Sequence, residues 1–236
     1  MDIELKNKVD SLNLKAVLFD MDGVLFDSMK FHSKAWVYAM NSLGVPFTEY
    51  DAYMREGMTG AGTISEIFKE RLGRQATEDE CERIYKIKSE YFDSLGVAPV
   101  IDGIELVLKK VKDCGLDIFL VTGSGQKSLL EKLNRNFKGY FSKEKMITAY
   151  DVKYGKPNPE PYLKALEKGM LKPNEAIVVE NAPLGVKAGH SAGIFTVAVN
   201  TGILRDEELT KNGADVLFHN MYELSDFIPN IIKTKK

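Results

Sequence analysis

The sequence predicts an α/β protein with a doubly wound parallel sheet and one inserted all-helical module. Four short apolar runs have the length and continuity of strands that are covered on both faces. Helical patterns lie between the last three runs, and strands that alternate with helices favour a parallel sheet. Residues 27–95 carry helical patterns alone, which indicates an insertion after the first strand. The four runs are residues 16–19, 118–121, 176–179 and 195–199.

The inserted module contains a series of helical patterns and no strand-like run. Apolar residues recur at helical spacing in its first segment, which Gly44 and Pro46 bring to an end. Thr77 and Glu80 form a capping box that opens its last helix. The helices predicted here are residues 28–43, 50–55, 63–72 and 77–91. We therefore predict a helical module over 27–95 and a sheet-containing core over 1–26 and 96–236.

Helices in the predicted core have start and stop signals. Gly115 follows the last apolar residue of one pattern and is expected to end it. Asn158, Pro159 and Glu160 have the order of an N-cap, a first-turn proline and a first-turn acid. The helices predicted here are residues 104–114, 128–133, 162–168 and 183–192.

The composition excludes several classes of function. Hydrophobic residues make up 44% and charged residues 28% of the chain, and the net charge is −2, so we expect no nucleic-acid partner. No stretch approaches the roughly 18 apolar residues of a membrane span. Cys81 and Cys114 lie far apart, which favours neither a disulfide framework nor a metal site. Residues 1–6 lack the apolar core of a signal peptide, so we expect a cytoplasmic protein.

Polar residues follow three of the predicted strands, and a lysine lies on a nearby loop. Ligands of open α/β sheets bind at the carboxyl ends of the strands, so these residues are candidates for a site. They are Asp20 with Asp22, the turn Thr122-Gly123-Ser124-Gly125, Lys156, and Glu180 with Asn181. Oxygen ligands without His or Cys suit Mg²⁺, and Mg²⁺ with one lysine suits a phosphate.

These motifs resemble those of the haloacid dehalogenase superfamily of phosphotransferases, over essentially the whole chain. The matching motifs are Asp-x-Asp-Gly-Val at 20–24, Thr-Gly-Ser at 122–124, Gly-Lys-Pro at 155–157 and Glu-Asn at 180–181. The helical insertion resembles the cap of the branch that contains β-phosphoglucomutase and small-molecule phosphatases. The resemblance implies a Rossmann-like core, a mobile cap and phosphoryl transfer, and it is poorly specific for substrate.

The resemblance also implies catalytic roles. Asp20 would attack phosphorus and form an aspartyl-phosphate. Asp22 would protonate the leaving oxygen and then take a proton from water, a role that argues against a dehalogenase. Thr122 and Lys156 would hold the phosphoryl oxygens, together with the Gly123-Ser124 turn.

A Mg²⁺ site is implied at the same place. Its ligands would be Asp20, the backbone carbonyl of Asp22, and the side chains of Glu180 and Asn181. Many relatives have aspartate where this chain has Asn181. An amide oxygen can ligate Mg²⁺ but adds no negative charge, so we expect a lower affinity. This substitution leaves open a non-catalytic protein that binds phosphate compounds.

Two cap residues are candidates for substrate binding. The spacing of His32 from Asp20 matches a cap histidine that lies beside the acid/base in the β-phosphoglucomutase branch, and Lys88 aligns with a cap lysine that reaches the substrate there. Without the resemblance, His32 would be taken as structural and Lys88 as part of a solvated helix face.

The cap segment 55–63 bears on the substrate. In the mutase, this loop supplies an arginine that binds the distal phosphate of the substrate. The corresponding position here is Gly60, which cannot bind a phosphate through a side chain, so the mutase reaction would require Arg55 or another cation in that role. The sequence around Glu56 instead resembles relatives that hydrolyse inorganic pyrophosphate, in which the cap glutamate helps to ligate Mg²⁺. We therefore expect a Mg²⁺-dependent phosphohydrolase of a small phosphate compound, with pyrophosphate as the leading candidate. The alternatives are β-phosphoglucomutase, a sugar-phosphate phosphatase and, outside the enzymes, a receiver-like or phosphate-binding protein.

Overall fold

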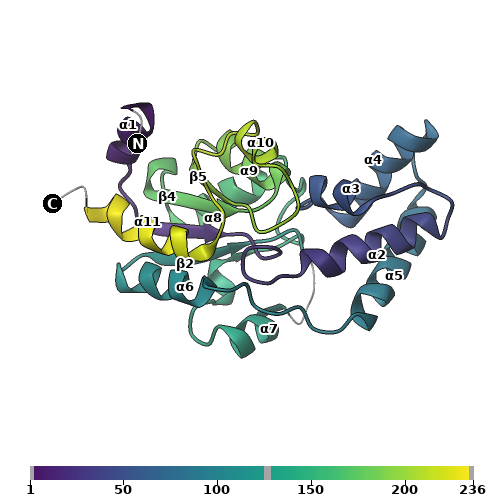
Figure 1. Cartoon of the computed structure of the whole chain (residues 1–236), viewed down its shortest axis with the longest axis horizontal. Coiled ribbons are helices and arrows are strands. Elements are labelled where there is room, and N and C mark those ends of the chain that lie inside the picture. The colour runs from purple at the N-terminus through teal and green to yellow at the C-terminus, as the bar shows by residue number, and fades with distance from the viewer. Residues whose placement is uncertain (1–2, 125–128, 234–236) are drawn as a thin grey trace.

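The computed structural model describes residues 3–124 and 129–233. In these residues, six parallel strands form one sheet in the order β3-β2-β1-β4-β5-β6, which confirms the predicted doubly wound fold (Figure 1). The strands are β1 (Ala16–Phe19), β2 (Asp117–Val121), β3 (Met146–Ile147), β4 (Ala176–Glu180), β5 (Phe195–Val199) and β6 (Val216–Phe218). The order places β1 between β2 and β4, so the residues that follow these three strands meet at one edge.

Four strands coincide with the four apolar runs, whereas β3 and β6 are additional to the prediction. All four residues of β1 are buried, as a central strand covered on both faces requires. In contrast, β3 pairs with β2 through two residues only. The three residues of β6 lie at the other edge of the sheet and are partly exposed. Segments so short carry no periodic signal that separates a strand from a loop.

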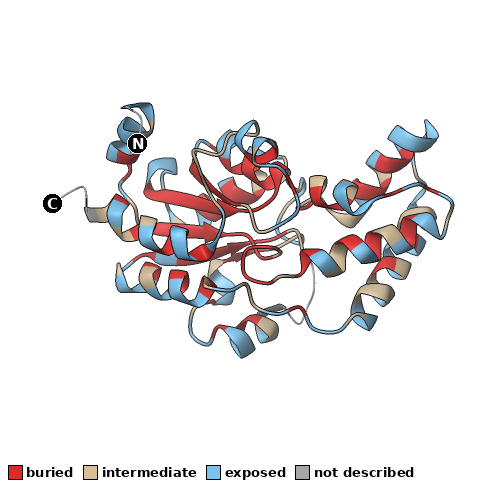
Figure 2. Cartoon of the chain, in the orientation of Figure 1, coloured by how far each residue is buried: buried red, intermediate tan, exposed pale blue. Residues whose placement is uncertain are grey.

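Alternate residues of the strands pack into two apolar layers. Val17 and Phe19 of β1 face one layer, and Ala16 and Leu18 face the other. Helices on the first face are α1 (Ile3–Ser11), α6 (Ile104–Asp113), α7 (Leu129–Asn136) and α11 (Met221–Lys233). Helices on the second face are α8 (Glu160–Gly169) and α9 (Pro183–Ser191), with α10 (Asp206–Thr210) against α9 and β6. The strands are accordingly buried throughout most of their length (Figure 2).

The predicted core helices are present with shifted ends. α7 continues three residues beyond the predicted Leu133, and the predicted first residue, Ser128, lies outside the described residues, as does Gly125. α8 begins two residues before the predicted 162 and ends one residue after the predicted 168, and the side chain of Asn158 accepts a hydrogen bond from the Glu160 N–H at 2.9 Å. The helices α1, α10 and α11 were not predicted. None of the described helices has the length and apolarity needed to cross a membrane.

Helices alone make up the module between β1 and α6. They are α2 (Met29–Asn41), α3 (Glu49–Met54), α4 (Gly60–Leu72) and α5 (Glu78–Ser94), gathered at one end of the molecule (Figure 1). Their apolar faces form a separate cluster that includes Trp36, Ile64 and Ile84. The capping box of Thr77 and Glu80 is present. The boundaries at residues 26 and 96 stay a prediction.

The chain passes between core and module at two adjacent segments. The Asp27 N–H donates to the Pro99 carbonyl at 2.9 Å, and the Ile101 N–H donates to the Leu25 carbonyl at 3.0 Å. These bonds place the two crossings side by side, immediately after the turn that contains Asp20 and Asp22. The module is therefore attached next to the predicted site.

Candidate active site

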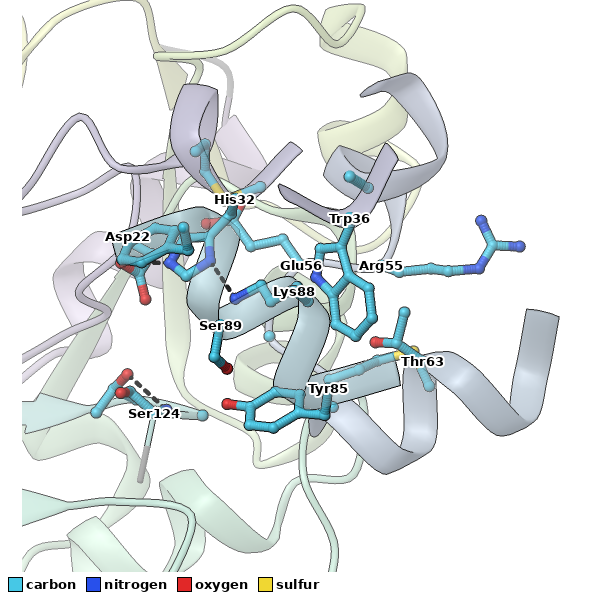
Figure 3. A pocket seen from close by; sticks show the side chains of 18 of the residues that line it. Asp22, His32, Trp36, Arg55, Glu56, Thr63, Tyr85, Lys88, Ser89 and Ser124 are labelled. Carbon is cyan, nitrogen blue, oxygen red and sulfur yellow. Dashed lines mark hydrogen bonds and ion pairs between the residues drawn. The ribbon is translucent and has the colours of Figure 1, made fainter. Parts of the chain in front are cut away.

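A cavity of about 640 Å³ lies where the carboxyl ends of the strands face the helical module. Core residues and module residues both contribute to its wall, and Figure 3 shows it from close by. The predicted site residues among them are Asp20, Asp22, His32, Glu56, Lys88, Thr122, Gly123 and Ser124. Residues far apart in the sequence thus share one concave space, as is usual for small-molecule sites.

Asp20, Lys156 and Glu180 form a buried charged cluster. Lys156 Nζ donates to Asp20 Oδ1 at 2.5 Å, to Glu180 Oε1 at 2.6 Å and to the Val121 carbonyl at 3.1 Å. The hydroxyl of Tyr162 donates to the same Glu180 Oε1 at 2.6 Å. All four side chains are buried. The ends of β1, β2 and β4 are therefore joined by one ammonium group.

The surroundings of Asp20 disfavour the ionised form of its carboxyl group. Burial, followed by repulsion from Glu180 and Asp22, raises the pKa of Asp20 to about 7, although Lys156 opposes this rise. The two carboxylates hold the pKa of Lys156 above its usual value in spite of burial. One cation therefore does not neutralise this group of acids.

Asp22 lies at the end of a chain of polar contacts that reaches into the cap. Ser28 Oγ donates to Asp22 Oδ1 at 2.5 Å, and His32 Nε2 lies 3.4 Å from the same oxygen. Lys88 Nζ lies 2.8 Å from His32 Nδ1 (Figure 3). Because a protonated lysine can only donate, His32 Nδ1 accepts and the ring proton is on Nε2, facing Asp22.

The pKa values along this chain follow from burial and charge. Burial lowers the pKa of Lys88 to about 8. Burial and the charge of Lys88 also lower the pKa of His32, although Asp22 opposes this. Burial works against ionisation of Asp22, but His32 and Ser28 hold its pKa below the usual range. These surroundings favour the ionised form of Asp22 and the neutral form of His32.

The turn after β2 is formed by residues 122–124. Thr122 is buried, and its Oγ1 accepts a hydrogen bond from the Ser124 N–H at 3.1 Å. A Cβ added to Gly123 would lie 3.1 Å from the Gly57 carbonyl oxygen of the cap. The absence of a side chain at Gly123 therefore lets the cap loop approach the turn closely.

Glu56 reaches from the cap into the group of core acids. Asn181 Nδ2 donates to Glu56 Oε2 at 3.1 Å, while Glu56 Oε1 and Asn181 Oδ1 are buried without a hydrogen-bond partner in the described structure. Burial and repulsion from Asp20, Asp22 and Glu180 raise the pKa of Glu56 well above its usual value. Two orphaned oxygens beside several carboxylates have the chemistry of a site for a hard cation.

This donor set fits Mg²⁺, although it is not a preformed cage. No three Asp, Glu, His or Cys side chains of the described residues meet as a ready-made metal centre. The ammonium group of Lys156 contacts both Asp20 and Glu180. The oxygens of Asp20, Glu56, Glu180 and Asn181 could hold Mg²⁺, which commonly keeps several waters and takes few protein ligands.

Tyr85 occupies the space next to Gly60 in the cap. A Cβ added to Gly60 would lie 2.3 Å from Cδ2 of the Tyr85 ring, so no side chain fits there while the ring keeps this position. The Tyr85 ring lies 6.4 Å from the Trp36 ring and 5.7 Å from Lys88 Nζ, measured from its centroid. Tyr85 thus narrows the cap side of the cavity.

Arg55 is directed away from the reaction end of the cavity (Figure 3). Its guanidinium contacts three cap carboxylates: Glu70 at 2.5 Å, Asp51 at 3.5 Å and Glu66 at 3.6 Å. These contacts tie α3 to α4 across the loop that carries Glu56. Arg55 therefore does not stand where it could replace a distal phosphate ligand at position 60.

Three residues of the site were not found from the sequence. Ser28 precedes α2 like an N-cap, but its hydroxyl bonds Asp22 and makes no cap bond. Tyr162 follows the apolar pattern of α8, and nothing in that pattern marks its hydroxyl. Tyr85 lies three residues before Lys88, which is the one available signal, because i and i+3 share a helix face.

The chain is similar to known proteins over most of its length. Residues 17–199 match the model of haloacid dehalogenase-like hydrolases. A solved protein of Bacteroides vulgatus, provisionally named a β-phosphoglucomutase, is 49% identical to this chain, with a TM-score of 0.93. The matched region spans 98% of this chain and 96% of the Bacteroides chain. A phosphorylated carbohydrates phosphatase of Thermotoga maritima is 32% identical over 77% of this chain and 82% of its own. A Caldanaerobacter subterraneus protein, provisionally named the pyrophosphatase PpaX, is 27% identical over 92% of this chain and 96% of its own.

Proposed function

The chain belongs to the haloacid dehalogenase-like hydrolase family, and we propose that it hydrolyses inorganic pyrophosphate with the help of Mg²⁺. It is a phosphatase of small phosphate compounds, as its relatives indicate. The single observation that carries the choice of pyrophosphate is the contact between Glu56 of the cap and Asn181 of the core, with one oxygen on each side chain that has no partner among the described residues.

Asp20 is the proposed nucleophile. One oxygen, Oδ1, is bound to Lys156, and the other would attack phosphorus, so that the phosphate leaving group departs and an aspartyl-phosphate forms. Lys156 and the hydroxyl of Thr122 would hold the phosphoryl oxygens as charge develops on them. Water would then cleave the aspartyl-phosphate, which restores Asp20 and releases the second phosphate.

Asp22 is the proposed acid and base, oriented by Ser28 and His32. Its ionised form can take a proton from the water that attacks the aspartyl-phosphate. To protonate the leaving oxygen it must first carry a proton, and the negative charge of a bound phosphate beside it favours that form. Lys88 and His32 would contact the leaving phosphate from the cap side.

The residues proposed to hold Mg²⁺ are Asp20, the backbone carbonyl of Asp22, Glu180, Asn181 and, from the cap, Glu56. When bound, Mg²⁺ supplies positive charge that attracts and polarises the phosphoryl oxygens. Glu56 can join this set only while the cap lies against the core. We propose that residues 27–95 are a mobile cap and that closure excludes bulk water from the site.

The cap favours a small leaving group. Glu56 brings a carboxylate to the reaction centre, and the Tyr85 ring fills the space beside Gly60. Arg55, which could have served a distal phosphate, is bound by cap carboxylates. These three features support pyrophosphate over a sugar bisphosphate, and a protein of similar sequence carries a pyrophosphatase name.

Sugar-phosphate hydrolysis is the second candidate. The cavity of about 640 Å³ exceeds what two phosphate groups require, and Trp36, Tyr85 and Phe92 line it with aromatic surface that sugars can stack against. Relatives named as a carbohydrate-phosphate phosphatase and a β-phosphoglucomutase agree with this candidate. Hydrolysis of pyrophosphate is expected to depend on Glu56 more strongly than hydrolysis of a sugar phosphate.

The Glu56→Ala variant separates them. We expect kcat/KM for pyrophosphate to fall about 100-fold and the Mg²⁺ concentration for half-maximal rate to rise at least about tenfold, because a carboxylate beside the metal is lost. Turnover of glucose 6-phosphate, measured in the same phosphate-release assay, should fall less. The matched control is Glu82→Ala, which removes an exposed carboxylate of α5 and should change neither quantity. Unchanged pyrophosphate turnover and Mg²⁺ dependence in Glu56→Ala would contradict the proposal.

A further inference from the structure

A tyrosine hydroxyl is buried under the reaction centre. Tyr162 of α8 is fully buried and packs with Leu18, Phe119 and Val178 in the apolar layer on one face of the sheet. A phenylalanine ring would satisfy that packing equally. The hydroxyl instead donates to Glu180 Oε1 at 2.6 Å, as a buried polar group must find a partner.

The two oxygens of Glu180 are held differently. Oε1 accepts from both the Tyr162 hydroxyl and Lys156 Nζ, each at 2.6 Å. Oε2 accepts from the backbone N–H of Asn181 at 3.2 Å. A Cβ added to Gly185 would lie 2.0 Å from Oε1, so the start of α9 leaves room for this carboxylate only because residue 185 is glycine. Glu180 is therefore confined from α8, α9 and the Lys156 loop.

Tyr162 and Lys156 are not equivalent donors. Lys156 is shared between Glu180 and Asp20, so a movement of Asp20 during the reaction also moves the ammonium group. The phenol is neutral and sits on a rigid ring within the core. It fixes one carboxylate oxygen independently of Asp20 and adds no charge that would compete with a cation.

We infer that Tyr162 is a positioning residue that orders Glu180 and thereby sets the affinity of the site for Mg²⁺. This inference rests on the proposed Mg²⁺-dependent function. Ordering a ligand beforehand lowers the entropy lost when the metal binds, and partners of metal ligands typically contribute about 10- to 100-fold to affinity. Tyr162 touches no reacting atom, so its effect belongs to metal binding and not to chemistry at saturating Mg²⁺.

The test is calorimetric titration of Mg²⁺ into the whole protein without substrate. The Tyr162→Phe variant keeps the ring, and we expect its Kd for Mg²⁺ to rise about tenfold while kcat at saturating Mg²⁺ stays within about twofold. The matched control is Tyr222→Phe, which removes a similar bond to Asp102 Oδ1 at 2.9 Å on the surface. Its Kd should equal that of the wild type. Gly185→Ala disturbs the same carboxylate from α9 and should also raise Kd.

The outcomes separate the inference from the proposed function. If the Kd for Mg²⁺ of Tyr162→Phe equals that of the wild type, the inference is wrong and the proposed function is unaffected. The same holds if Tyr222→Phe raises the Kd as much as Tyr162→Phe does. Wild-type protein that neither binds Mg²⁺ nor requires it for hydrolysis overturns both. If Tyr162→Phe does not fold, an unchanged Kd in Gly185→Ala overturns the inference in its place.

Discussion

The Asp20→Asn variant is expected to lose phosphate release from pyrophosphate by about 10⁴-fold or more. The amide has the shape of the carboxylate but cannot form the aspartyl-phosphate. Asp22, the other carboxylate of this turn, is held by Ser28 and His32 in the proposed acid/base role. The measurement is the initial rate of phosphate release at saturating Mg²⁺. Hydrolysis that remains intact would contradict the assignment of Asp20.

The stability of the same variant serves as its control. Burial, Glu180 and Asp22 raise the pKa of Asp20 to about 7, far above the usual 3.8 of an unfolded chain. In the metal-free protein, ionisation of Asp20 therefore opposes folding increasingly from about pH 4 to about pH 7. The amide introduced by Asp20→Asn does not ionise, so the thermal midpoint of this variant in EDTA above pH 7 should equal or exceed that of the wild type. If the thermal midpoint of Asp20→Asn is instead lower than that of the wild type, the loss of activity could result from unfolding and would not support Asp20 as the nucleophile.

The Lys156→Met variant is expected to lose both activity and stability. Lys156 Nζ contacts Asp20 and Glu180, and its removal leaves two carboxylates buried without their cation. Breaking such a buried pair costs about 3–5 kcal/mol of unfolding free energy, and loss of a donor to the phosphoryl oxygens costs about 10²–10³ in kcat. Urea unfolding in EDTA and initial rates of phosphate release measure the two effects.

Lys145→Met is the control for this prediction. Lys145 Nζ lies 2.6 Å from Asp117 Oδ1, but both side chains are substantially exposed, so we expect a change below about 1 kcal/mol. Mg²⁺ should restore part of the stability of Lys156→Met, because a cation again faces the buried acids. Equal, small effects in the two variants would refute a charge-balancing role for Lys156.

The sheet could be predicted where burial on both faces demands a continuous apolar run. That condition holds for β1, β2, β4 and β5, and each appears as such a run. It fails for β6, whose three residues are partly exposed at an edge. Short edge strands depend on their neighbours more than on their own sequence, which is why β3 and β6 could not be located.

Some residues of the candidate site could be predicted from the sequence, and others depend on tertiary packing. Asp20 and Glu180 end strands, so the topology of the fold alone brings them to one edge of the sheet. The family resemblance indicated His32 and Lys88 separately as site residues, but their contact, across 56 residues of sequence, depends on how α2 packs on α5 and was not predicted. The hydroxyl of Tyr162 bonds Glu180 because of tertiary packing that no local pattern of α8 records.

The most direct test of the central claim is a comparison of kcat/KM for pyrophosphate, hexose phosphates and acetyl phosphate, with and without Mg²⁺, beside a coupled assay for conversion of β-glucose 1-phosphate. We predict Mg²⁺-dependent turnover with a preference for pyrophosphate of at least about tenfold, which corresponds to about 1.4 kcal/mol of differential transition-state binding. A preference for a hexose phosphate, or efficient conversion of β-glucose 1-phosphate, would contradict the account and mean that the cap binds a sugar.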